Sequence, residues 1–175
     1  RVQDDNCIGG MIMSEGIGAR VLRKEDKRFI TGKGRYTDDI VEDNQAYAAF
    51  VRSPHAHARI VSINTTAAME MDGVETVLMG PELVADGIGN IICGWGVTSK
   101  DGSPMNMGAW SALATEKVRY VGDAVAIVVA DTKSLAKLAA ESVVVTYEEL
   151  PVVVGSVQAL EKGAPQLHDN APGNL

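Results

Sequence analysis

The sequence predicts an α/β protein with a mixed, α+β-like sheet built around one strand–helix–strand unit. Residues Ala124 to Ala130 are almost wholly apolar and β-rich, which is typical of a fully buried strand. Thr132 can cap a following helix, because its hydroxyl can accept a free N–H of the first turn. A second strand is predicted over Val143 to Tyr147. We therefore expect a βαβ unit over residues 124–147, with both strands parallel in one sheet and a right-handed crossover. The helical face expected to pack on that sheet carries Leu135, Leu138 and Ala139.

Shorter elements are expected beside this unit. The further predicted strands are Ala46–Val51, Arg59–Ile63 and Val74–Leu78. Ser53-Pro54 breaks the chain between the first two, and a short helix is predicted over residues 67–71. Gly80-Pro81 should open another helix that ends before Gly87, because proline favours the first helical position and glycine the position after the last.

Composition excludes several classes of protein. With 175 residues and 46 % hydrophobic residues, the chain can form one sizeable globular core. A net charge of −7 argues against nucleic-acid binding, which depends on clustered Lys and Arg. Apolar runs are far shorter than the ~20 residues of a membrane span, and no secretory signal is evident. Cys7 and Cys93 lack metal-type spacing, so we expect a cytoplasmic protein with free thiols.

The first residues are set apart from the predicted domain. The sequence begins with Arg1, and Met11 and Met13 follow shortly afterwards. Residues 1–15 are therefore interpreted as a leader or remnant, and residues 16–175 as a single domain.

Two histidines could be metal ligands. His55 and His57 are two residues apart, so both would point to one face of an extended segment. A metal site needs at least one more ligand, and His168, the third histidine, lies far away in the C-terminal tail. The pattern therefore favours structural histidines, and no metal ligand is assigned.

Glycine-rich and acidic segments favour turns over binding sites. Lys24 to Ile30 is compatible with a short helical turn ended by Gly32 and Gly34, but this segment does not have the spacing of a phosphate-binding loop. The same holds for Gly87 to Gly96. An acidic loop lacks the calcium-binding pattern and is expected to be solvated: Asp38, Asp39, Glu42 and Asp43.

The segment from Asp86 to Ser111 has no sustained hydrophobic period. It is rich in glycine and carries four large apolar side chains that something must cover: Trp95, Met105, Met107 and Trp110. One hypothesis is that these residues pack against another domain or subunit. The alternative, that they fold back onto the core of this domain, is equally compatible with the sequence.

Four strings in order carry a resemblance to a known family. They are GARVLRKEDKRFITGKGRYTDDI (18–40), FVRSPHAHARIVSINT (50–65), VGDAVAIVVADT with YEELP (121–151) and GAPQLHDNAPGN (163–174). Together they resemble the α/β-hammerhead domain of the molybdenum-binding large subunit in the xanthine oxidase family, which includes aldehyde oxidases and carbon monoxide dehydrogenases.

The resemblance implies a structural part of an oxidoreductase. Members of the family bind molybdenum through a pterin, use a glutamate base, and pass electrons through iron–sulfur clusters to flavin on partner domains or subunits. The cofactor-binding loop and that glutamate lie downstream of this domain in the family, and Glu148-Glu149 is no substitute. No catalytic, cofactor-binding or metal residue is therefore assigned to this chain. We expect an N-terminal scaffold and interface domain, inactive alone, whose partners are the remainder of the subunit and the iron–sulfur and flavin components. The alternative is a free-standing interaction protein that reuses the fold.

Overall fold

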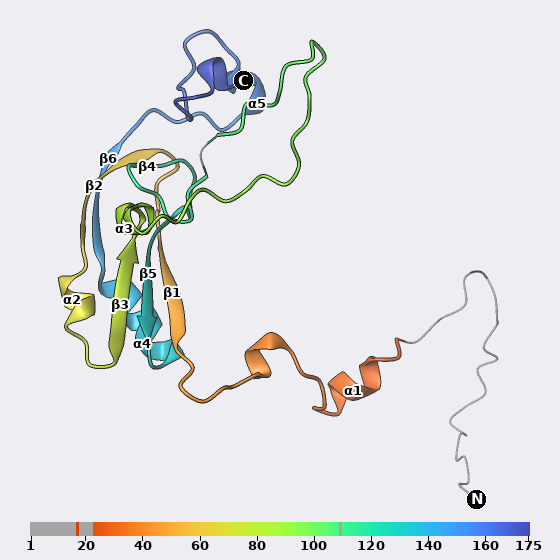
Figure 1. The fold of residues 1–175 in the computed structure, drawn as a ribbon, viewed down its shortest axis with the longest axis vertical. Coiled ribbons are helices and arrows are strands. Elements are labelled where there is room, and N and C mark those ends of the chain that lie inside the picture. The colour runs from red at the N-terminus through yellow and green to blue at the C-terminus, as the bar shows by residue number, and fades with distance from the viewer. Residues whose placement is uncertain (1–16, 18–22, 109) are drawn as a thin grey trace, which may run out of the picture. The chain divides into compact units, whose positions relative to one another are not determined.

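The structure is a computed structural model that describes residue 17 and residues 23–108 and 110–175 (Figure 1). By its contacts the chain divides into two units, residues 1–43 and 44–175, and each is described by itself. The predicted leader, residues 1–15 with Cys7, lies outside the described residues, and the boundary at residue 16 stays a prediction.

Among its described residues, the first unit contains one short helix and one 3-10 turn. They are α1 (Asp26–Ile30) and η1 (Thr37–Asp39). Helix α1 ends as predicted, because Gly32 has a φ of 70°, a backbone conformation that glycine adopts without strain.

The second unit contains two antiparallel three-stranded sheets. The first sheet has the order β1 (Tyr47–Arg52), β5 (Ala124–Ala130) and β3 (Val74–Met79). The second has the order β4 (Lys117–Val118), β2 (Ala58–Asn64) and β6 (Val144–Glu149). The predicted α/β class is confirmed.

Strand β5 is the centre of its sheet, as its apolar sequence predicts. Ile127 lies opposite Phe50 of β1 on one side and Leu78 of β3 on the other. Val125 and Val128 have no exposed surface. A strand paired along both edges and covered on its faces tolerates a continuous apolar run.

The single parallel sheet predicted for residues 124–147 is wrong. Strands β5 and β6 lie in different sheets, and α4 (Lys133–Ser142) carries the chain from one to the other. Both edges of β5 are already occupied by β1 and β3, so β6 pairs with β2 instead. The predicted strands 46–51 and 59–63 also lie in different sheets.

Helix α4 begins as predicted, and its buried face matches the predicted one only in part. The Thr132 hydroxyl accepts the N–H of Leu135 at 3.1 Å, which caps the helix. Ala139 is buried as predicted, together with Ala136, whereas Leu138 is 57 % exposed, so the predicted burial of Leu138 is wrong. Because alanine side chains are short, this face can approach β1 and β5 closely.

The core joins the two sheets. It contains two clusters of buried residues, one around Ala126 and Val128 and one around Ala58 and Val125. Val51, Ile63 and Val145 pack against both clusters, and these residues come from β1, β2 and β6.

The remaining helices are short. They are α2 (Thr66–Met69), α3 (Gly80–Ala85), α5 (Ser156–Ala159) and η2 (Pro172–Asn174). Helix α3 begins at Gly80-Pro81 and is followed by Gly87 with a φ of 80°, as predicted. Among the described residues, no helix has the length and apolarity to cross a membrane.

Candidate functional site

A buried histidine ties the start of β2 to the end of β6. His57 is 5 % exposed, and its Nδ1 lies 2.8 Å from the carbonyl oxygen of Pro151. The N–H of Leu150 donates to the carbonyl oxygen of His57 at 3.0 Å. The carbonyl of Pro151 can only accept, so Nδ1 carries the proton in this contact. His57 therefore joins the SPHAHA and YEELP strings at one end of the second sheet.

The turn before β5 is bonded to the same region. Ser53 donates its N–H to Asp123 O at 2.8 Å, and Gly122 donates to Ser53 O at 2.8 Å. The Arg52 guanidinium donates to Gly122 O at 2.9 Å. Gly122 has a φ of 92°, which explains why this turn contains glycine. The second and third of the four strings thus meet around the junction of the two sheets.

The fourth string is held by one asparagine. The Asn174 side chain accepts from Leu167 N at 3.0 Å and donates to the carbonyl oxygens of Ala159 and Pro165, each at 2.9 Å. Arg119 Nε donates to Leu167 O at 2.8 Å. The C-terminal segment is therefore attached to the residues that follow β4.

A pocket of about 170 Å³ lies between these segments. Trp110 and Tyr120 line it with their rings 6.0 Å apart, and Lys117, Arg119 and His168 also contribute to its wall. Burial, then the charge of Arg119, lowers the pKa of His168 below its ordinary value, although nearby Asp169 opposes this shift.

Charges around the pocket are largely compensated. Lys117 Nζ lies 2.9 Å from Asp169 Oδ1, and this hydrogen bond is the main reason that the pKa of Asp169 is lowered. Asp123, also in the wall, accepts the backbone N–H of Arg119 at 3.0 Å. Burial, then Asp123, raises the pKa of Tyr120. These groups hold one another in place and show no free nucleophile–base pair.

The structure does not bring the three histidines together. His55 Nδ1 lies 3.7 Å from Glu149 Oε1 and its ring lies 4.9 Å from that of Tyr147, whereas His168 lines the pocket described above. Within residues 23–108 and 110–175 there is no group of three or more side chains that could hold a metal ion.

The loop over residues 86–111, called the apolar loop below, leaves its apolar side chains largely exposed. Trp95 is 81 % exposed, Trp110 55 % and Met107 52 %, and Met105 is half-buried. Figure 1 shows this loop in green, next to the C-terminal segment in blue. In the alternative, these residues fold back onto the core of this domain. Trp95, Met107 and Trp110 are not buried in that core.

Sequence reasoning missed several residues of this surface. The additional exposed side chains are Ile88, Ile91, Ile92 and Val97. An available signal was the absence of charge, because no charged residue occurs between Asp86 and Lys100. The pocket was also missed, since Lys117, Arg119 and His168 meet only through tertiary structure.

This fold corresponds to a known class of domain. Residues 31–151 match the family described as aldehyde oxidase and xanthine dehydrogenase, a/b hammerhead domain. The chain belongs to this family, and the resemblance inferred from the four strings is confirmed.

Individual relatives are large subunits of oxidoreductases. The chain is 40 % identical over 159 residues to the carbon monoxide dehydrogenase large chain of Hydrogenophaga pseudoflava, a match covering 90 % of this chain and 18 % of that one. It is 39 % identical to the nicotine 6-hydroxylase large subunit of Paenarthrobacter nicotinovorans, covering 91 % and 19 %. The crystal structure of quinoline 2-oxidoreductase from Pseudomonas putida 86 matches with a TM-score of 0.74 and 39 % identity, covering 85 % and 18 %. The chain thus spans about a fifth of the length of these relatives.

Proposed function

We propose that this chain works as the structural α/β-hammerhead domain of the large subunit of a molybdenum-dependent oxidoreductase. The observation that supports this most directly is a match over 90 % of the chain to a protein of which it covers only 18 %. Another relative, from Escherichia coli O157:H7, is named as a xanthine dehydrogenase molybdenum-binding subunit. In this proposal the domain is a scaffold, and catalysis belongs to the rest of the subunit.

The described residues do not fit the family's molybdenum–pterin cofactor. The pocket beside His168 has a volume of about 170 Å³, whereas small-molecule sites occupy roughly 300–1,000 Å³. A second hollow, of about 400 Å³, has no Lys or Arg in its wall to bind the cofactor's phosphate. No cofactor and no reaction step is assigned to this chain. We place the molybdenum–pterin cofactor in the remainder of the subunit, and iron–sulfur clusters and FAD on partner domains or subunits.

The proposed partners are the remainder of the large subunit and the iron–sulfur and flavin components. One relative is named as the gamma subunit of a 6-hydroxypseudooxynicotine dehydrogenase complex, which supports assembly with other subunits. The interface is assigned to the exposed side chains of the apolar loop, with the residues Trp95, Met105, Met107 and Trp110. The net charge of −7 does not favour nucleic acid as a partner. We place the assembly in the cytoplasm, where an exposed free thiol such as Cys93 stays reduced.

Purification of the native gene product under non-denaturing conditions tests this function. We expect a protein several times longer than residues 1–175 that co-purifies with molybdenum, pterin, iron and flavin. Metal analysis and the fluorescence of the oxidised pterin provide the readouts. A product that ends near residue 175 and contains no molybdenum would contradict the proposal and favour the free-standing interaction protein.

A further inference from the structure

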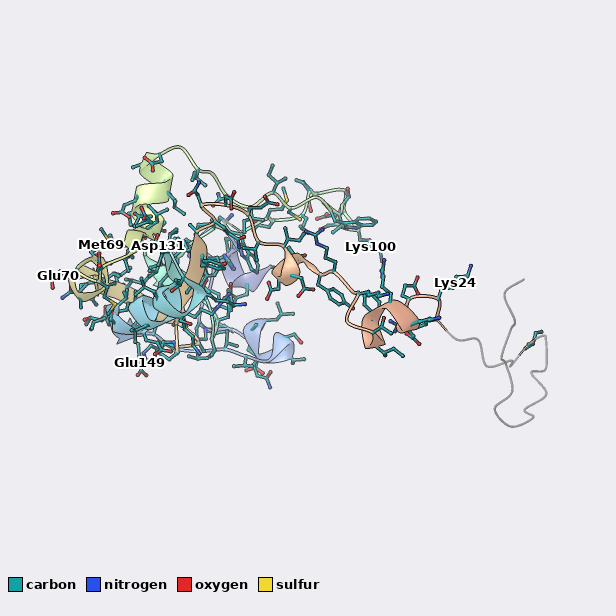
Figure 2. All side chains as sticks on the ribbon, turned by 90° about the horizontal axis from the view of Figure 1, so that it is seen from below. Lys24, Met69, Glu70, Lys100, Asp131 and Glu149 are labelled. Atoms are coloured by element: carbon teal, nitrogen blue, oxygen red, sulfur yellow. The ribbon has the colours of Figure 1, made fainter. Side chains whose placement is uncertain are left out.

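Most of the large apolar side chains of the apolar loop are exposed to solvent. Seven of its apolar side chains are 49 % or more exposed: Ile88, Ile91, Ile92, Trp95, Val97, Met107 and Trp110. Its charged residues are only Asp86, Lys100 and Asp101, of which the last two lie near its tip (Lys100 is labelled in Figure 2). Depletion of charge together with exposed aromatic and methionine side chains is the composition of the buried centre of an interface.

Hydrogen bonds between residues of the loop nevertheless hold its tip in a defined conformation. Near the tip, Met105 donates its N–H to Val97 O at 3.0 Å, and Ser99 donates to Ser103 O at 2.8 Å. Asp101 accepts from both the N–H and the hydroxyl of Ser103, at 3.0 and 2.7 Å. Because these bonds are formed without burial of the side chains, the surface is preorganised, which reduces the entropy lost on docking.

The base of the loop is fixed to the C-terminal segment. The Asn106 amide donates to Asn170 O at 2.6 Å, and the Asn170 amide donates to Met107 O at 2.9 Å. Gly108 packs closely on His168, since a Cβ at this glycine would lie 2.7 Å from the ring nitrogen Nδ1. The loop is therefore a fixed part of the second unit.

The loop also contains a hollow suited to an apolar side chain. Its volume is about 400 Å³, and it is open to solvent. Ile91, Ile92 and Met107 supply apolar walls, and Asn90 and Asn170 supply uncharged polar groups. A charged group placed there would lose water without gaining a counter-charge.

We propose that the apolar loop docks permanently onto an uncharged, apolar surface of the remainder of the same large subunit, with an aliphatic or aromatic side chain of that surface in the hollow. This inference rests on the proposed function. The permanence of the contact is inferred from the small number of charged residues in the loop, because interfaces that form once and stay closed are more apolar than those between exchangeable partners. The relatives are long enough to supply such a surface, since about four fifths of their length lies outside the match.

Cys93 is a native reporter for this contact. It lies in the wall of the hollow, is exposed in the described structure, and its thiol is free. We propose to label the full-length large subunit, first alone and then in the assembled complex, with a maleimide and to follow the Cys93 peptide by mass spectrometry. Lys137→Cys provides a matched control, because Lys137 lies on the exposed face of α4.

We expect Cys93 to react at least about a hundredfold more slowly than the control thiol in the isolated large subunit, since a covered thiol reacts only during local opening. Fast labelling of the isolated subunit with protection only in the complex would overturn the assignment and identify another subunit, or a second copy, as the occupant. Fast labelling in both samples would overturn docking altogether.

A variant that introduces a charged side chain into the hollow provides a second test. Ile92→Lys should raise the labelling rate of Cys93 towards that of the control, whereas Val157→Lys, an exposed apolar site on α5, should leave it unchanged. Equal effects of the two variants would contradict a specific contact at the hollow. Failure of the proposed function is distinguishable, because it would appear as a gene product without molybdenum, whereas a molybdenum-containing subunit with a reactive Cys93 would contradict only the docking.

Discussion

Between the two sheets, Val125 and Val128 have no exposed surface, whereas Trp95 in the apolar loop is 81 % exposed. Both regions are rich in apolar residues, and both contain backbone hydrogen bonds. They differ in what covers the side chains: the sheets and α4 cover one another, whereas most of the large apolar side chains of the loop stay exposed among the described residues. Apolar residues therefore stabilise this domain in the first region and are available to a partner in the second.

The comparison between the buried sheets and the apolar loop predicts its largest loss of stability for a substitution at Gly80. A Cβ at this residue would lie 2.9 Å from Leu113 O and closer still to the carbonyl group of Ala114. Because both obstacles are backbone atoms, Gly80→Ala should destabilise the chain by about 3 kcal/mol, the upper end of overpacking costs. Urea unfolding provides the measurement. Gly89→Ala, in the apolar loop with open space around it, is the matched control, and equal losses in the two variants would break the comparison.

A smaller loss is expected at the junction of the sheets. His57→Ala removes the contact with Pro151 O and leaves a small cavity, so we expect a cost of about 2 kcal/mol. The neighbouring His55, whose side chain is 30 % exposed, gives a control variant His55→Ala with a cost below about 1 kcal/mol. A thermal-unfolding series in which both variants behave alike would show that His57 has no special role.

The smallest effect concerns pH. Burial and Arg119 lower the pKa of His168 below its ordinary value of 6.5. The unfolded chain therefore binds this proton more readily, so the stabilisation is complete above pH 6.5 and is lost as pH falls from there towards the folded pKa. His168→Gln should flatten the pH dependence of the free energy of unfolding in this window. The lowered pKa of Asp169 acts only at more acidic pH, below the ordinary value of 3.8. An unchanged slope in His168→Gln would contradict this assignment.

Sequence patterns predicted the elements better than their arrangement. The apolar run of β5, the Thr132 cap and the Gly80-Pro81 helix start depend on local physics and are confirmed. The pairing of β5 is not local: it depends on β1 and β3, whose distant sequences occupy both of its edges. A strand–helix–strand pattern does not distinguish one sheet from two when this competition is unknown.

The candidate site shows the same division. Large apolar side chains in a long, glycine-rich loop without a hydrophobic period indicated the interface hypothesis for Trp95 and Trp110. Both side chains are exposed, and the interface stays a prediction. The pocket beside His168 depends on the C-terminal segment folding back onto the residues after β4, and no sequence period predicts that contact. Leu138 was misplaced because helical spacing alone does not choose between two adjacent faces when α4 can pack closely through alanines.

Paired unfolding measurements on Val128→Ala and Trp95→Ala test the central contrast most directly. Val128 is fully buried, so its truncation should cost about 2–3 kcal/mol although it removes few atoms. Trp95→Ala removes a far larger side chain, yet should change the free energy of unfolding of the 175-residue chain by less than about 0.5 kcal/mol, as expected for an exposed site. If Trp95→Ala instead cost as much as a core aromatic, about 3–5 kcal/mol, the loop would belong to the core of this domain and the interface would be contradicted.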